Sequence, residues 1–287
     1  MRASRFSSPL VLAGWMAVAT LPAAAAGPIP TIASTDDPAN WEGISNPALD
    51  GEARIHLSGG STCSGTLLSG GLYVLTAAHC LTGPDSGVLA VNTETTLFFN
   101  QHKASALSVA AAAFYIAPGW QGFNFSAGDG SDIALIKLAT PVTSVAGYAL
   151  SSSLDLGKTF MMAGYGQIGT GLTGATGPYG ELHYGFNVID TTDYALQSAL
   201  IAQYGGTLYN KLGETYVYDF DNGVADQNAI QRLYGLVGIS AGSNLGLGTS
   251  EAMIGQGDSG GGDFVLGAGV DVVRLNFSHG TDRKSVV

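Results

Sequence analysis

The amino-acid sequence predicts an all-β protein. Glycine supplies 42 of the 287 residues, and it separates short apolar stretches instead of following a strict repeat. Short apolar or alternating stretches that are bounded by turn residues are typical of strands in a β-barrel or a β-sandwich. The predicted strands cover residues 53–57, 63–68, 72–76, 95–99, 108–115, 133–138, 159–163, 215–218, 233–239 and 269–276.

Two segments depart from this pattern. Thr192 is a predicted helix cap, because apolar residues follow it at helical spacing until two glycines at 205 and 206 end the run. The most glycine-rich stretch, residues 164–180, predicts a mobile loop between strands.

The charge balance excludes one large class of partners. The sequence has 22 Asp and Glu against 11 Lys and Arg, which gives a formal net charge of −11. Nucleic-acid binding needs a basic face that neutralises phosphates, so we expect no nucleic-acid partner. The length fits one large domain or two small ones, and the sequence contains no internal repeat.

Both ends of the sequence are expected to lie outside the folded domain. Residues 1–26 predict a secretory signal peptide, with two arginines, an apolar run and three alanines before the cleavage point. That run is too short to span a bilayer, so we expect an exported protein, extracellular or periplasmic, without a membrane span. Residues 27–52 predict an N-terminal arm or propeptide. Residues 282–287 match the translation of a common sequencing adapter, so we expect a non-native tail on a natural protein that extends further.

The two cysteines fit this expectation of export. An oxidising compartment allows Cys63 and Cys80 to form a disulfide. Two thiolates without further ligands make an incomplete metal site, so we expect neither a metal ion nor a cofactor.

Three short strings place a reactive side chain beside the groups that it needs. His79 lies in Thr-Ala-Ala-His-Cys, where small neighbours allow tight packing, and Asp132 stands directly before the apolar strand Ile-Ala-Leu-Ile. Ser259 lies in Gly-Asp-Ser-Gly-Gly, where glycines allow a sharp turn that exposes a hydroxyl and directs backbone N–H groups to one point. Singly, each string has an ordinary structural explanation: a packed histidine, a turn-forming aspartate and a flexible loop.

Together, and in the order His, Asp, Ser, these strings resemble the trypsin-like serine proteases, which have the chymotrypsin fold. The resemblance implies two six-stranded antiparallel β-barrels, with the second barrel incomplete at the C-terminus. It places a protease domain at residues 53–281, with the boundary between the barrels near residues 140–160.

The resemblance also implies a role for each residue of the three strings. Ser259 is the expected nucleophile, His79 the general base and then acid, and Asp132 the carboxylate that holds the imidazole tautomer. The backbone N–H groups of Gly257 and Ser259 are the expected oxyanion hole. In this family a disulfide brackets the histidine loop, which implies a bond between the two cysteines.

Substrate contacts follow from the same resemblance. Met253 occupies the position that floors the primary specificity pocket, and an uncharged floor argues against Lys or Arg at the cleaved bond. The segment expected to pair with the substrate backbone consists of Ser278, His279 and Gly280.

Activation departs from the family pattern. Members normally free an Ile-Val-Gly-Gly terminus, whose ammonium pairs with the aspartate before the nucleophile, here Asp258. Residues 27–52 contain no such string, and Ile44 is the candidate that remains. Because a buried carboxylate without a partner is destabilising, we expect another cation or another N-terminus to serve Asp258.

These observations predict a secreted serine endopeptidase that acts on polypeptides through an acyl-enzyme. The alternative is a catalytically inactive binding protein on the same scaffold, since a fold alone does not guarantee activity. An esterase is a poorer interpretation, because the nucleophile elbow of that class follows a strand, and no strand signal precedes the glycine-rich string around Ser259.

Overall fold

The computed structural model describes residues 41–43, 45–83, 85–122, 130–151, 156–171, 173–205, 215–220, 228–236, 238, 246–247, 251–265 and 272–275. The predicted signal peptide, the predicted tail and the segment Ser278, His279 and Gly280 lie outside the described residues. Within the described part, no helix is long and apolar enough to cross a membrane.

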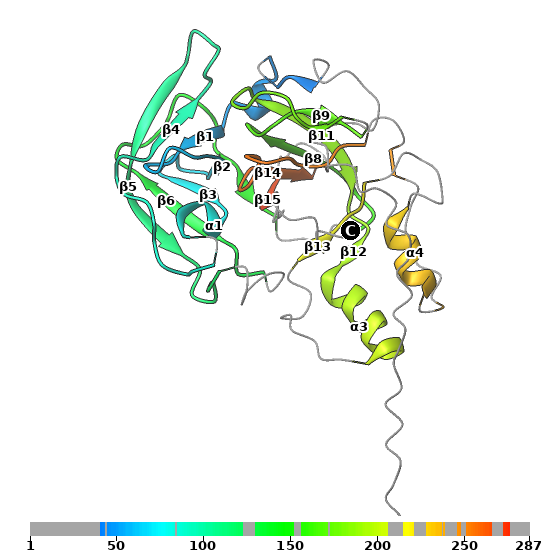
Figure 1. The fold of residues 1–287 in the computed structure, drawn as a ribbon. Coiled ribbons are helices and arrows are strands. Elements are labelled where there is room, and N and C mark those ends of the chain that lie inside the picture. The colour runs from blue at the N-terminus through cyan, green and yellow to red at the C-terminus, as the bar shows by residue number, and fades with distance from the viewer. Residues whose placement is uncertain are drawn as a thin grey trace, which may run out of the picture.

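Six antiparallel strands close into a barrel, which Figure 1 shows at the left in blue to green. The strands run in the order β1-β2-β3-β6-β5-β4. Their bounds are β1 Glu52–His56, β2 Thr62–Leu67, β3 Tyr73–Thr76, β4 Thr96–Phe99, β5 Leu107–Ile116 and β6 Ala134–Leu138. Alternate residues of β4 and β6 are buried, as expected for strands that face a core on one side. The predicted strands of this half are therefore confirmed.

Every strand of the barrel contributes side chains to its core, and so does the helix α1 (Ala78–Leu81). Most of these side chains are aliphatic, and Phe99, Trp120 and the two cysteines complete the core. Fully buried members include Ile55, Leu97, Phe99 and Ile136. The closed barrel leaves no free strand edge and makes a rigid support for the loops at its ends.

The second half contains a five-stranded sheet in the order β11-β8-β14-β15-β7. The strands are β7 Ala149–Leu150, β8 Thr159–Gly164, β11 His183–Val188, β14 Gly262–Val265 and β15 Val272–Leu275. All pairs are antiparallel except β15 with β7, which is parallel. The prediction of two six-stranded barrels is thus confirmed for the first, whereas the described residues of the second half form an open sheet.

Strand β8 is buried on both faces of this sheet. Met161 and Ala163 pack with Tyr148 and Phe264 on one face, beside the 3-10 helix η2 (Pro47–Leu49). Phe160 and Met162 pack on the other face in a cluster that includes Ala252 and Ile254. The segment before Ser259 is therefore fixed to the second sheet.

Two helices lie on the far side of this sheet from the barrel (Figure 1). The helix α3 (Asp193–Tyr204) begins after Thr192, whose side chain accepts a hydrogen bond from the Ala195 N–H, and ends at Gly205, as predicted. The helix α4 (Ala229–Leu236) packs against α3 through Ile230 and Tyr234. The strand predicted at 233–239 is wrong, because its described start belongs to α4.

Short pairings complete the described structure. The strand β12 (Thr191–Thr192) pairs with β13 (Tyr216–Val217), and β9 (Gly169–Thr170) pairs with β10 (Gly174–Ala175). The glycine-rich stretch predicted as a loop thus contains a small hairpin. Strands β11 and β14 lie outside every predicted strand.

Candidate active site

His79 and Asp132 come from neighbouring strand ends of the barrel. His79 lies in α1, which follows β3, and Asp132 lies just before β6. Because β3 and β6 pair directly, with Thr76 opposite Ala134, the two flanking segments leave the barrel side by side. The barrel topology therefore brings together two residues that are 53 positions apart in sequence.

Asp132 holds His79 through both of its carboxylate oxygens. Oδ2 lies 2.7 Å from Nδ1 of the imidazole, and Oδ1 accepts a hydrogen bond of 2.8 Å from the His79 backbone N–H. Asp132 is 7% exposed. A carboxylate at Nδ1 keeps the proton on that nitrogen, which makes Nε2 the nitrogen that can accept another proton.

Ser259 lies in a turn between Ile254 and β14, and this turn packs against the barrel. The Ser259 carbonyl accepts a hydrogen bond of 2.9 Å from the Ser64 N–H of β2. Gly260 has φ +83°, and a Cβ there would collide with Thr76 Oγ1 and the Ser64 carbonyl. Only glycine allows this backbone conformation and this close approach, so the glycine after the serine brings the two halves into contact.

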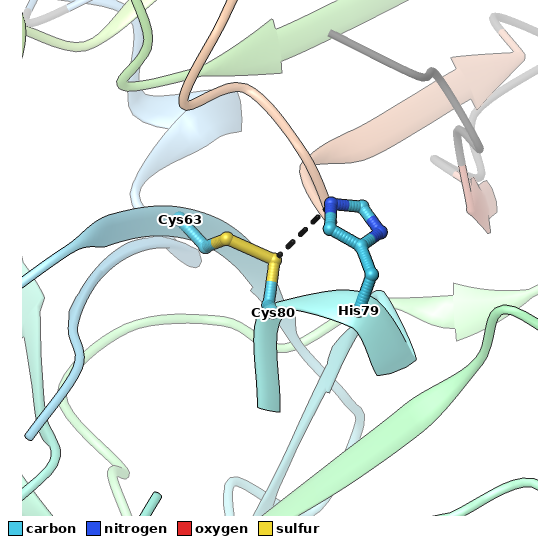
Figure 2. A group of neighbouring side chains, drawn as sticks. All are labelled: Cys63, His79 and Cys80. Atoms are coloured by element: carbon cyan, nitrogen blue, oxygen red, sulfur yellow. Dashed lines mark hydrogen bonds between the residues drawn. A yellow bond between two sulfur atoms is a disulfide. The ribbon is translucent and has the colours of Figure 1, made fainter. Parts of the chain in front are cut away.

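The disulfide predicted between Cys63 and Cys80 is present, and it joins β2 to α1 (Figure 2). Sγ of Cys80 lies 3.8 Å from Nε2 of His79 and 3.6 Å from the Ser259 carbonyl oxygen. The same sulfur thus contacts both residues, which places Nε2 on the side of the imidazole that faces the serine turn.

The sulfurs and the imidazole form the one cluster of metal-ligand atoms found among the described residues. Both sulfurs are consumed by the disulfide, and a metal prefers the thiolate form of cysteine. The chemistry of this cluster does not fit a metal site.

Two backbone N–H groups of the turn are available for an oxyanion. Within the described part of the chain, neither the Gly257 N–H nor the Ser259 N–H donates a hydrogen bond. Gly257 has φ +101°, a conformation that L side chains rarely adopt. Stabilisation of a developing negative charge requires such unused N–H donors, held in place by a fixed turn.

Comparison with known proteins finds similarity to one family. Residues 44–185 match the protein family described as Trypsin. A trypsin-like protease of Streptomyces glaucescens is 35% identical over 123 residues, which are 42% of this chain and 42% of that protein. The matched region, residues 44–185, belongs to the trypsin-like serine protease family. The matched range contains His79 and Asp132, whereas Ser259 lies beyond it.

Sequence reasoning missed one buried residue of this trypsin-like site, Ser64. Its Oγ donates to the Gly257 carbonyl at 2.9 Å and accepts from the Tyr165 N–H at 2.9 Å, and the residue is fully buried. Ser64 thereby connects β2, the serine turn and the segment after β8. In the sequence, the neighbouring Cys63 is the one feature that could have drawn attention to Ser64.

The partner of Asp258 was also missed. Asp258 is 4% exposed, and its Oδ1 lies 3.0 Å from Nε2 of His183 on β11. Oδ1 also accepts from the Gly166 N–H at 2.7 Å, and Oδ2 accepts from the Gly255 N–H at 2.9 Å. A histidine of the same chain therefore occupies the place where a cation was expected.

Met253, the predicted pocket floor, is half-buried and lies beside this pair. With Ile254 and Gly164 it lines a small cavity that His183 and Asp258 also border. The predicted substrate-pairing segment lies outside the described residues. Of the predicted substrate contacts, the structure therefore describes Met253 alone.

Removing the disulfide is expected to lower the stability of the trypsin-like domain. The Cys63→Ala, Cys80→Ala double variant loses a crosslink over a sequence separation of 17, and a loop of this size contributes about 3 kcal/mol. Urea unfolding measures the difference from the wild-type chain. A thiol reductant serves as the control, because it should destabilise the wild type and leave the double variant unchanged. Equal unfolding midpoints of the two proteins would contradict the prediction.

Proposed function

We propose that this chain is a serine endopeptidase that cleaves polypeptides through a covalent acyl-enzyme. The observation that carries the proposal is the partly buried pair of Asp132 Oδ2 and His79 Nδ1 at 2.7 Å. It is supported by Ser259, which contacts the sulfur that also contacts Nε2.

The proposed reaction begins with the hydroxyl of Ser259. A serine hydroxyl is a weak nucleophile, so His79 Nε2 takes its proton during attack on the carbonyl carbon of the peptide. Asp132 keeps the imidazole oriented and stabilises the imidazolium that forms. The N–H groups of Gly257 and Ser259 donate to the oxyanion.

Collapse of this intermediate breaks the peptide bond. The imidazolium of His79 gives its proton to the leaving amine, and the acyl group stays on Ser259. Water then attacks the ester, with His79 again as the base, and the serine is regenerated. Every proton that this cycle moves passes through Nε2.

The uncharged Met253 supports a preference for an uncharged residue at the cleaved bond. We also propose export of the protein, on the basis of the signal-like residues 1–26 and of the disulfide, which is stable in oxidising compartments.

Labelling with a fluorophosphonate tests the proposal directly. We expect the full chain to gain one covalent adduct on Ser259 and to cleave unfolded casein, because only an activated serine reacts with this probe. The Ser259→Ala variant should lose both the adduct and the cleavage.

The exposed Ser61 gives a matched control, because Ser61→Ala removes a hydroxyl that lies away from the pair. That variant should label at the rate of the wild type. A folded wild-type chain that takes up no label would favour the inactive binding protein, and an adduct that persists in Ser259→Ala would assign the nucleophile elsewhere.

A further inference from the structure

Asp258 is a buried carboxylate inside the serine turn, directly between the two residues whose N–H groups form the proposed oxyanion hole. Backbone N–H groups of Gly166 and Gly255 donate to its two oxygens at 2.7 and 2.9 Å. Both oxygens thus act as acceptors, which is the arrangement of an ionised carboxylate. A buried ionised group of this kind needs a cation close by.

His183 has the geometry of that cation. Its Nδ1 lies 3.1 Å from the Glu181 carbonyl oxygen, and its Nε2 lies 3.0 Å from Asp258 Oδ1, at ion-pair distance although off the N–H axis. A carbonyl accepts hydrogen bonds and donates none, so Nδ1 needs a proton, and a carboxylate oxygen 3.0 Å from Nε2 favours a proton on that nitrogen as well. The surroundings therefore select the doubly protonated imidazolium.

The electrostatic balance points the same way. Burial disfavours the cation, but the charge of Asp258, the contact with its carboxylate and the Glu181 carbonyl outweigh burial. Together they raise the pKa of His183 above its ordinary value.

Few other charged groups face the pair. The remaining residues that line the cavity are uncharged. Glu42, which bridges to the His183 backbone, has an exposed side chain, and Glu181 directs its carboxylate to His102 at 2.8 Å. Glu52 lies on the Asp258 side, where the charge of Asp258 contributes to the raised pKa of its carboxyl group.

The described segment before the barrel contributes no ion pair to Asp258. Gly43 donates to the Leu182 carbonyl at 2.7 Å, and Glu42 lies antiparallel to His183, so this segment runs along β11. Among the described residues, His183 is the one cationic side chain at ion-pair distance from Asp258.

We propose that His183 is a positioning residue, whose imidazolium neutralises Asp258 and keeps the Gly257–Ser259 turn assembled without a freed N-terminal ammonium. This inference rests on the proposed function and adds a means of activation to it. His183 touches no substrate atom; it acts through Asp258 on the two flanking N–H groups.

The first test compares His183→Gln with the wild type in hydrolysis of a peptide amide. We expect kcat to fall about 100-fold, the size of effect that loss of an oxyanion donor has, with little change in KM. His102→Gln is the matched control, because His102 also pairs with a carboxylate but has a side chain that is 41% exposed. Wild-type kcat in His183→Gln would overturn the proposal.

The second test blocks the α-amino group of the mature protein. Cyanate near pH 7 modifies this group ahead of lysine, because its pKa is lower, and mass spectrometry identifies the terminus and the extent of modification. Activity that survives full modification supports the proposal. Lost activity overturns it, and so does a terminus that reacts only after unfolding.

A third measurement separates this inference from the proposed function and from misfolding. Proton-detected NMR of the histidine rings should give His183 a higher pKa in the wild type than in Asp258→Asn, whether or not the chain hydrolyses peptides. An imidazole that titrates alike in both proteins overturns the pairing. A wild type that takes no fluorophosphonate but shows the shift overturns the proposed function and with it the positioning role, while the pairing stands.

Discussion

Replacing Asp132 with asparagine is expected to lower kcat on the order of 10⁴-fold, the size of effect that the same change has in Ser-His-Asp triads of this family. Asp132 accepts from the His79 backbone N–H with one oxygen and from Nδ1 with the other, at 2.8 and 2.7 Å. An asparagine has one acceptor and one donor in this place. If its oxygen keeps the backbone N–H, its NH₂ group faces Nδ1 and forces the proton onto Nε2.

A protonated Nε2 cannot accept the serine proton, so the loss should appear in kcat and leave KM almost unchanged. Steady-state kinetics with a peptide amide measures both constants. Glu181→Gln is the matched control, because Glu181 pairs with His102 at 2.8 Å but has a side chain that is 46% exposed. The triad assignment would be contradicted by Asp132→Asn with more than about a tenth of wild-type kcat, since catalysis would then not depend on the Asp132 carboxylate at Nδ1.

The barrel half could be predicted from the sequence because its strands carry local signals. Strands β1 to β6 alternate in burial or form compact apolar runs between turn residues, and both patterns persist in any tertiary setting. Glycines that the serine turn needs are equally local, which is why the string around Ser259 was visible.

The second half was harder to predict because its signals depend on tertiary contacts. Residues from 233 onward form a short apolar run, which fits a strand or a buried helix equally well. Packing of Ile230 and Tyr234 against α3 decides for the helix. Strands β11 and β14 begin with a histidine and a glycine, which are weak strand signals. Both strands form by pairing with β8, which is buried on both faces.

The residues of the site also differ in whether the sequence alone points to them. The residues of the proposed triad were found because each lies in a string of its own. His183 and Ser64 lie in ordinary sequence and acquire a role through what the fold places beside them. The charge requirement of Asp258 was predictable from chemistry, but the identity of its partner was not, because β11 meets the serine turn only in three dimensions.

Glu52 is expected to make stability fall as the pH rises through neutrality. It is fully buried at the start of β1, where Oε1 accepts from Thr66 Oγ1 at 2.7 Å and Oε2 from the Gly262 N–H at 3.4 Å. Burial, with a smaller contribution from the charge of Asp258, raises its pKa to about 8 in spite of these hydrogen bonds. The folded chain therefore keeps a proton on Glu52 at pH values where the unfolded chain has released it.

The sign follows from proton binding. Between the unfolded pKa of 4.5 and the folded pKa of about 8, the folded state binds more protons, so the free energy of unfolding decreases with rising pH. The limit is about 1.4 kcal/mol per pH unit, which amounts to about 5 kcal/mol over the window. Glu52→Gln removes the titration and should leave a flatter profile of unfolding free energy against pH, with the variant more stable than its parent at pH 8.

Urea unfolding at several pH values measures this difference. Every protein carries Ser259→Ala to prevent self-cleavage, and Glu181→Gln is the control for loss of an exposed carboxylate. Parallel profiles with and without Glu52→Gln would show that the carboxyl group is ionised in the fold, and the contact between β1 and β14 would then contain a buried charge instead of a proton.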